Sequence, residues 1–230
     1  RRESPAHAAD RSGRSARPGG RLTSAAMTKP TLTYFDIPAS RGEECRLALA
    51  LAGVDFVDNR IKGPAWPELK PTTPFGSLPT LELPGKGVFA QSNAILVLVG
   101  RKHGLHPTDD FVAARHEALM AFAEELRHHV SPALRIKEEP ERTNKRTELA
   151  TTYIPTWAGF VERQLGDGPF VAGDKLHVVD LKLYIVMRWF KSGSVDLVPT
   201  TVFDGFPRLR RLFDAVAEHP GVKAWQARQA

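Results

Sequence analysis

The chain of 230 residues has one cysteine, Cys45, and no long apolar run. A single cysteine forms neither an internal disulfide nor a cysteine-rich zinc site, and it is typical of a reducing compartment such as the cytoplasm. No apolar stretch approaches the roughly 20 residues that a membrane-spanning helix needs. These absences argue against a disulfide-stapled secreted scaffold and against a helical membrane anchor.

Little net positive charge remains outside the N-terminal segment. Residues 1–26 hold six arginines and two acidic residues, so they account for +4 of the net charge of +6 and leave +2 for residues 27–230. No basic patch interleaved with aromatic residues is present. The charge therefore gives no reason to expect nucleic acid as a partner.

Residues 1–26 are rich in Arg, Ala, Ser, Gly and Pro, which is the composition of a disordered segment. Two interpretations are open. The segment can be a non-native extension before a true start at Met27, or an organellar transit peptide, since those are rich in Arg and Ser and poor in acids. Its two acidic residues and the Pro18-Gly19-Gly20 break favour the first. We expect a cytoplasmic protein unless this segment directs import.

The apolar pattern of the next part predicts an α/β domain. Residues 31–35 and 55–60 have strand character, and a helix is expected between them over residues 41–52. Two short strands, over 80–83 and 88–89, and a helix over 92–103 follow. Strand–helix–strand and then strand–strand–helix (βαβ-ββα) is the order of a thioredoxin-like domain, expected over residues 27–103.

Residues 104–110 are the expected linker to an all-helical domain over residues 111–230. Apolar residues recur every four positions from Ala118 to Leu134, which predicts one face of a long helix. A charged break is expected over residues 137–144. Further helices are predicted over four ranges: 147–165, 178–191, 207–217 and 222–229.

The segment from Pro74 to Leu83 has the features of a peptide-binding site. Pro79 cannot donate to a strand ladder and forces Leu78 into an extended conformation, so the backbone amide and carbonyl of Leu78 can face a ligand. A cis Leu78–Pro79 bond would hold them there. Ser92, at the start of a helix, is expected to cap free amides and leave donors for a carboxylate. Together these features suit a small acidic peptide.

Tyr34 ends the first strand and Arg41 begins the first helix. A phenol can donate to sulfur and a guanidinium favours a nearby negative charge, so both would lower the pKa of a bound thiol from about 8.5. Trp66 and Lys70 share one face of a helical turn, where they can wall a site and bind a carboxylate. The spacing alone leaves purely structural roles open for all four residues.

Other polar residues suggest structure more than chemistry. Neighbours such as His128 and His129 diverge around a helix, and no carboxylate or third ligand completes a metal site with them, so we expect no metal. Cys45 lies inside the first helix without a partner cysteine and is expected to pack. Asp180 is expected to bond free amides near a helix start.

Five motifs occur in order over nearly the whole ordered chain: Leu32–Phe35, Trp66–Pro71, Pro74–Pro79, Gln91–Ile95 and Phe170–Leu181. On these motifs residues 31–230 resemble a cytosolic glutathione S-transferase of the tyrosine type, with a sigma-like look. The resemblance implies a homodimer of two-domain subunits that consumes glutathione as co-substrate and needs no metal.

The resemblance also implies roles for individual residues. The catalytic pair would be Tyr34, which donates its hydroxyl to the glutathione sulfur, and Arg41, which supports the thiolate. Glutathione would also contact Trp66, Lys70, Ser77, Leu78, Pro79, Gln91 and Ser92. The hydrophobic electrophile would lie against Phe35, Ile37, His128 and Ser131. Phe75 would insert into the neighbouring subunit.

The function expected from this resemblance is conjugation of glutathione to electrophiles, as in detoxification. The same thiolate also suits isomerisation of a prostaglandin-like endoperoxide, or reduction of a peroxide. A non-catalytic glutathione-binding or structural relative is the alternative from another class. Three departures from the family pattern bear on the site: the loop between Tyr34 and Arg41 is one residue longer, Ser77 stands where a longer polar residue is usual, and Ala121 stands where many relatives carry an Asp.

Overall fold

A computed structural model describes residues 29–229, so the expected disordered segment over residues 1–26 lies outside the described residues. Four strands form one sheet in the order β2-β1-β3-β4: β1 (Thr31–Phe35), β2 (Val57–Ile61), β3 (Thr80–Leu83) and β4 (Gly87–Ala90). β1 runs parallel to β2, whereas β3 is antiparallel to both β1 and β4. The buried residues Leu32 and Leu81 lie opposite each other in the ladder.

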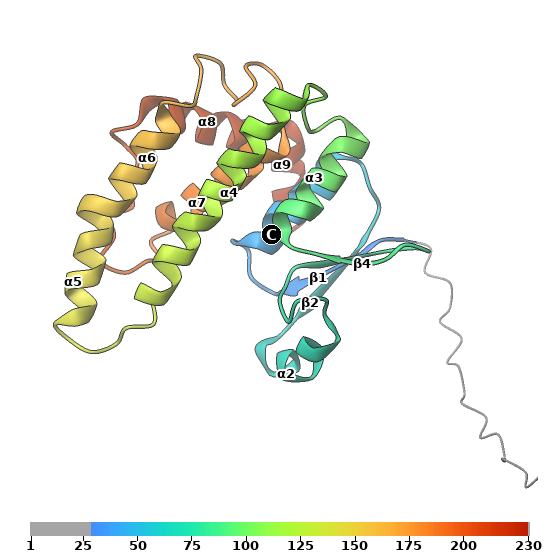
Figure 1. Cartoon of the computed structure of the whole chain (residues 1–230), viewed down its shortest axis with the longest axis horizontal. Coiled ribbons are helices and arrows are strands. Elements are labelled where there is room, and N and C mark those ends of the chain that lie inside the picture. Colours follow the sequence, from blue (N-terminus) through green and yellow to red (C-terminus); the bar gives the residue numbers. More distant parts are fainter. Residues whose placement is uncertain (1–28, 230) are drawn as a thin grey trace, which may run out of the picture.

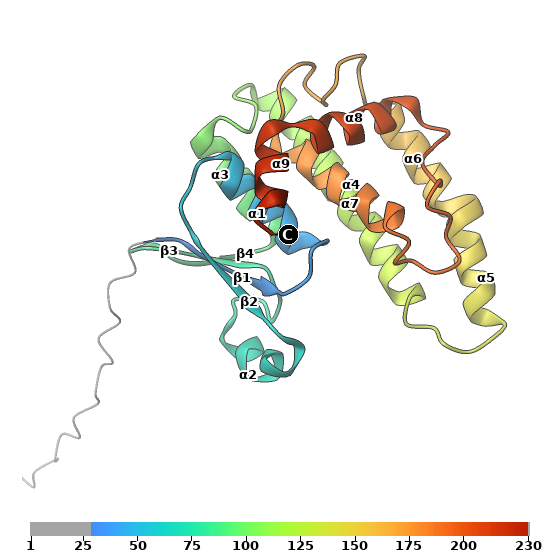
Figure 2. The ribbon, with the colours of Figure 1, turned by 180° about the vertical axis from the view of Figure 1, so that it is seen from behind.

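Two helices lie between this sheet and the rest of the molecule. α1 (Arg41–Leu51) joins the two parallel strands, and α3 (Ser92–His103) follows β4. The short α2 (Trp66–Leu69), flanked by single turns η1 (Gly63–Ala65) and η2 (Lys70–Thr72), lies on the opposite side of the sheet in both views (Figures 1 and 2). Cys45 is fully buried in α1. This arrangement confirms the predicted thioredoxin-like domain.

The second half of the chain is helical, as predicted. Its elements are α4 (Asp110–Ala133), α5 (Glu141–Glu148), η3 (Leu149–Tyr153), α6 (Ile154–Glu162), α7 (Val178–Lys191), α8 (Pro207–Glu218) and α9 (Pro220–Ala227). α7 is the centre of the core: every residue from Val178 to Met187 is buried. It packs against α1 as well as against α4 and α8, so the two halves share one core.

One helix was missed from the sequence. α5 begins at Glu141, inside the range 137–144 that was predicted as a charged break. Apart from Arg146, its residues are not buried, so the segment has no apolar period to reveal a helix. α5 continues through the π-turn η3 into α6, which makes one long helical rod at the edge of the molecule (Figure 1).

Candidate active site

Two adjoining pockets lie where the two halves of the chain meet. The larger has a volume of about 620 Å³ and is lined by Arg41, Ser77, Leu78, Gln91, Ser92, Asn93, Ala121, Glu124, Glu125, His128, Ser131 and Arg135. The smaller has a volume of about 180 Å³ and is lined by Ile37, Ala39, Ser40, Arg41, Arg127, Ser131 and Trp189. Arg41 and Ser131 line both, so the pockets are neighbours.

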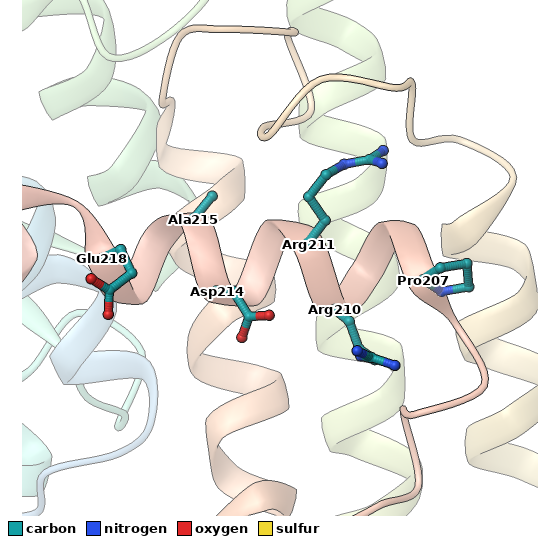
Figure 3. A pocket seen from close by; sticks show the side chains of 6 residues that line it. All are labelled: Pro207, Arg210, Arg211, Asp214, Ala215 and Glu218. Atoms are coloured by element: carbon teal, nitrogen blue, oxygen red, sulfur yellow. The ribbon is translucent and has the colours of Figure 1, made fainter.

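The hollow on α8 is of a different kind. It measures about 470 Å³ and is lined only by residues of that helix: Pro207, Arg210, Arg211, Asp214, Ala215 and Glu218. Figure 3 shows Arg210 and Asp214 on one side of the helix and Arg211 on the other. Arg211 donates to the carbonyls of Gly166 and Gly168 at 2.8 and 3.0 Å, so it ties down a loop. A charged face on a single helix is a weaker candidate than the pockets between the two halves.

Proline places Leu78 in the larger pocket. The Leu78–Pro79 bond is cis, as expected, and the ladder of β3 begins only at Thr80. The backbone amide and carbonyl of Leu78 therefore lie outside the sheet, at a position that lines the pocket. Ser77 lines the same wall, and Phe75 is 67% exposed.

The expected cap at Ser92 is wrong. Gln91 occupies the N-cap position of α3 with φ of 72°, and within residues 29–229 no side chain caps this helix. The Ser92 hydroxyl instead accepts a hydrogen bond from Lys182 Nζ at 3.1 Å. The physical reason is that a buried ammonium needs oxygen partners. The first amides of α3 keep no side-chain partner, so they still offer donors beside the pocket.

Tyr34 lies behind the smaller pocket. Its hydroxyl is 2.9 Å from Ser40 Oγ, and Ser40 lines the pocket whereas Tyr34 does not. Burial raises the pKa of Tyr34, so its phenol is protonated and can donate at neutral pH. A Cβ on residue 42 would lie 2.2 Å from the tyrosine ring, so only glycine leaves room for it.

Arg41 reaches both pockets from the first turn of α1. Its Nε donates to Glu124 Oε2 at 2.7 Å. Although burial raises the pKa of Glu124, the charges of Lys182, Arg127 and Arg41 outweigh burial and lower this pKa to about 2. Glu124 is therefore ionised, and it holds the guanidinium of Arg41 between the two pockets.

Glu44, Glu124, Arg127 and Lys182 form what we call the charge cluster. Lys182 Nζ donates to Glu44 Oε2 at 2.9 Å and also to Glu124, while Arg127 donates to Glu124 at 2.8 Å and to Glu44. Glu44 and Lys182 are fully buried. The cluster joins α1, α4 and α7 beneath the larger pocket. Sequence reasoning missed it, and its only signal is a charged residue inside an apolar run.

Some expected site residues do not line the pockets. Phe35 lies between Tyr34 and Trp66, with ring centroids 5.6 and 5.7 Å away. The side chain of Lys70 passes over Gly76, where a Cβ would be 3.5 Å from Lys70 Cε. The structure thus gathers most of the proposed residues in the pockets, and leaves Tyr34, Phe35, Trp66, Lys70 and Pro79 outside their lining.

His106, His116 and His177 form a second polar group, which we call the histidine cluster. The ring of His116 lies 6.3 Å from that of His106 and 5.3 Å from that of His177. All three are buried, and each Nδ1 lacks a hydrogen-bond partner among the described residues. Burial lowers the pKa of His116 and of His177 to about 4.

Three further observations concern the neighbouring histidines of α4, metal sites and membrane-spanning helices. His128 lines the larger pocket, whereas His129 stacks on Tyr153 with the two ring centroids 3.6 Å apart. Between residues 29 and 229, no group of three or more His, Cys, Asp or Glu side chains has the geometry to hold a metal ion. In the same range no helix is both long enough and apolar enough to cross a membrane.

Family models and relatives agree with this geometry. Residues 30–100 match the glutathione S-transferase N-terminal domain and residues 124–229 match its C-terminal domain. Glutathione S-transferase 1 of Ascaris suum is 32% identical over 208 residues, which cover 87% of this chain and 97% of the relative. The chain therefore belongs to the glutathione S-transferase family.

Solved structures give the same result. The prostaglandin synthase D of Nilaparvata lugens superposes with a TM-score of 0.78 and 27% identity, over 88% of this chain and 98% of the relative. A glutathione S-transferase of Necator americanus that is described as monomeric superposes with a TM-score of 0.77 and 28% identity, over the same shares of each chain. This protein is thus a glutathione transferase, with glutathione as co-substrate, as the sequence predicted.

Proposed function

We propose that this glutathione transferase binds glutathione in the larger pocket and an electrophile in the smaller one. The observation that carries the proposal is the shared wall at Arg41 and Ser131, with the Tyr34–Ser40 hydroxyl pair beside it. The sulfur of a glutathione bound in the larger pocket would lie at this wall. We also propose that the enzyme belongs to a sigma-like class and acts in detoxification. We propose a cytoplasmic location, which is in keeping with a single cysteine.

The binding roles follow from chemistry on each side of the larger pocket. The free backbone groups of Leu78 suit the cysteinyl unit, because a peptide recognises a peptide through paired amides and carbonyls. Gln91, Ser92 and the α3 N-terminus suit the γ-glutamyl carboxylate. Ser77 adds a hydroxyl nearby. Lys70, whose side chain lies next to Gly76, and Trp66 suit the glycyl carboxylate at the outer end.

The proposed chemistry begins with loss of the thiol proton to solvent. Tyr34, which burial keeps protonated, directs its O–H toward the sulfur, and Arg41 adds positive charge. The thiolate then forms a carbon–sulfur bond, and the leaving group departs with the electron pair of the bond that breaks. Activation comes from a larger thiolate fraction at neutral pH and from holding sulfur against the electrophile.

The direct test is the ultraviolet absorbance of the thiolate of bound glutathione, titrated over pH. In the wild type the bound thiol is expected to ionise well below pH 8.5. Tyr34→Phe is expected to keep glutathione affinity within about threefold but to lower kcat by about 10² to 10³, because one donor to the developing charge is lost. Ser40→Ala is the matched control that removes the other hydroxyl. Equal turnover in Tyr34→Phe would overturn this mechanism.

The volume of the smaller pocket bears on the alternative activities. Its 180 Å³ lies below the roughly 300–1,000 Å³ usual for drug-sized ligands, so a compact electrophile fits better than a prostaglandin-sized lipid. Conjugation is therefore favoured over endoperoxide isomerisation, although one similar structure carries the name prostaglandin synthase. A purely structural role is disfavoured because Arg41, Leu78 and Ser92 converge on one cavity.

We further propose a homodimer in which Phe75 of one subunit fills an apolar pocket of the other. Phe75 is 67% exposed, and a pocket of about 380 Å³ lies between α4 and α6, lined by Arg115, Ala118, Leu119, Phe122, Phe160 and Gln164. An exposed phenylalanine and an apolar pocket of this size suit insertion of the aromatic ring of one subunit into the other. Phe75→Ser is expected to shift the protein to monomers in sedimentation velocity, while Phe111→Ser, at another exposed phenylalanine, should not. A wild-type monomer would contradict the proposal.

A further inference from the structure

Lys182 is fully buried, and its ammonium has three N–H donors. Three oxygen atoms receive them: one from Glu44, one from Glu124 and the hydroxyl oxygen of Ser92. A lysine ammonium cannot accept a hydrogen bond, so in this contact the Ser92 hydroxyl must be the acceptor. The proton of that hydroxyl is then free to point elsewhere, and Ser92 lines the larger pocket.

The charges around Ser92 do not balance. Arg41, Arg127 and Lys182 are positive, whereas only Glu44 and Glu124 are negative, so the linked group has one positive charge in excess. Two further charged residues line the pocket, Glu125 and Arg135, and they have opposite signs. The excess comes from Arg41, whose side chain is 28% exposed at the pocket, so it would attract an anion bound beside Ser92.

We propose that Lys182 is a positioning residue for the γ-glutamyl carboxylate of glutathione. It fixes the Ser92 hydroxyl as a donor toward the larger pocket, and the carboxylate supplies the anion that Arg41 and the charge cluster together lack. The inference rests on the proposed placement of the γ-glutamyl end beside Gln91 and Ser92. It makes the site selective for a free carboxylate at that end of the ligand, and Lys182 achieves this without touching the ligand.

This role differs from a purely structural one in what it predicts. A lysine that only held α1, α4 and α7 together would affect stability and all ligands alike. A lysine that orients Ser92 affects binding of the carboxylate and little of the chemistry at sulfur. Its loss should therefore raise KM for glutathione and leave kcat at saturation within about threefold.

The test compares two ligands by calorimetry: glutathione, and the analogue in which the γ-glutamyl carboxylate is a carboxamide. The wild type is expected to bind glutathione at least about 30-fold more tightly than the carboxamide. Lys182→Met is expected to weaken glutathione binding by about 10- to 100-fold and to remove most of this discrimination. Lys191→Met, at the other end of α7, is the matched control and should bind both ligands as the wild type does.

Two more variants keep the test decisive if Lys182→Met folds poorly. Glu44→Gln/Lys182→Met removes the partner carboxylate together with the lysine, and it should show the same loss of discrimination. Ser92→Ala leaves the charge cluster in place and should also lose the discrimination between glutathione and the carboxamide. Adding Lys182→Met to Ser92→Ala should weaken glutathione binding little further. A Glu44→Gln/Lys182→Met variant that still prefers glutathione over the carboxamide as strongly as the wild type does would overturn the role of Lys182.

The proposal and the function beneath it fail in different ways. Tight glutathione binding that is indifferent to Lys182 would overturn this inference and leave the proposed function standing. No binding of glutathione by the wild-type protein would overturn both. Equal weakening of glutathione and the carboxamide in Lys182→Met, with kcat lowered to the same degree, would show that the lysine is structural only.

Discussion

The charge cluster and the histidine cluster both place polar side chains in the buried contact between α4 and α7. They differ in how these side chains are accommodated there. His116 and Arg127 lie on α4, and His177 and Lys182 lie at or near the start of α7. In the charge cluster every side chain is bonded to an opposite charge. In the histidine cluster each ring has an unpartnered Nδ1 among the described residues.

The difference between the two clusters lies in whether their side chains can lose a proton on burial. A buried guanidinium keeps its proton at any ordinary pH, so Arg127 must have carboxylates beside it. An imidazole can lose its proton instead, and burial has lowered the pKa of His116 and of His177 to about 4. Burial therefore selects ion pairs in one place and neutral rings in the other. Removing one side chain should therefore lower the free energy of unfolding strongly in the charge cluster and only slightly in the histidine cluster.

The largest expected effect is on stability at pH 7.5. Arg127→Met leaves Glu44 buried with a single cation, so the free energy of unfolding should fall by about 3–5 kcal/mol. His116→Leu, of similar burial, should change it by less than about 1 kcal/mol, since a neutral ring with an unmet nitrogen is replaced by an apolar group. Urea unfolding measures both. Equal losses would erase the distinction between the two clusters.

The second effect is on the pH dependence of stability. His116 and His177 have folded-state pKa values of about 4, below the unfolded value of 6.5, so the unfolded chain binds more protons between these values. The stability contributed by these two neutral histidines is therefore full above pH 6.5 and is lost as the pH falls toward 4, by at most about 1.4 kcal/mol per pH unit for each histidine.

His116→Leu should make this fall in stability shallower, and calorimetric Tm values from pH 4.5 to 7.5 test it. Glu124, with its folded-state pKa of about 2, stays ionised in the native protein, and the proton that the unfolded chain takes up on it near pH 4.5 adds the same slope to the wild type and to the variant. An unchanged slope in the variant would mean that His116 does not titrate with folding.

The smallest effect is the coupling between the clusters. His116 and Arg127 are separated by about 16 Å along α4, at a rise of about 1.5 Å per residue, and they share no partner. The double variant His116→Leu/Arg127→Met should therefore lose stability as the sum of the single variants, within about 0.5 kcal/mol. A larger departure in urea unfolding would show that the two clusters act as one.

The fold could be predicted where chemistry along the chain is local. The apolar composition of β1, α3 and α7 gave these elements with the bounds that the structure has. Proline chemistry gave the cis Leu78–Pro79 bond. Asp180 also accepts the expected amide bonds, from Val171 at 2.8 Å and His177 at 2.7 Å. α5 was missed because a polar helix has no such period.

Most of the candidate site could not be predicted in the same way. The bond from Lys182 to Ser92 joins residues 90 positions apart, and the bond from Arg127 to Glu44 joins residues 83 positions apart. Apart from the apolar run around Lys182, nothing local distinguishes such residues from exposed charges. Only the docking of the helical half on α1 and α3 brings them together. The resemblance to the family supplied part of the pocket lining, such as Arg41, Leu78 and Ser131, but not the charges beneath it.

Cys45 has a consequence for an enzyme that handles electrophiles. It is the only cysteine of the chain, it is fully buried in α1, and burial together with the neighbouring Glu44 raises the pKa of its thiol. Since alkylation requires an accessible thiolate, the protein resists modification by its own substrates. A cysteine introduced on the surface would then be the one reactive thiol, so a spectroscopic label could be attached there without altering the native sequence elsewhere.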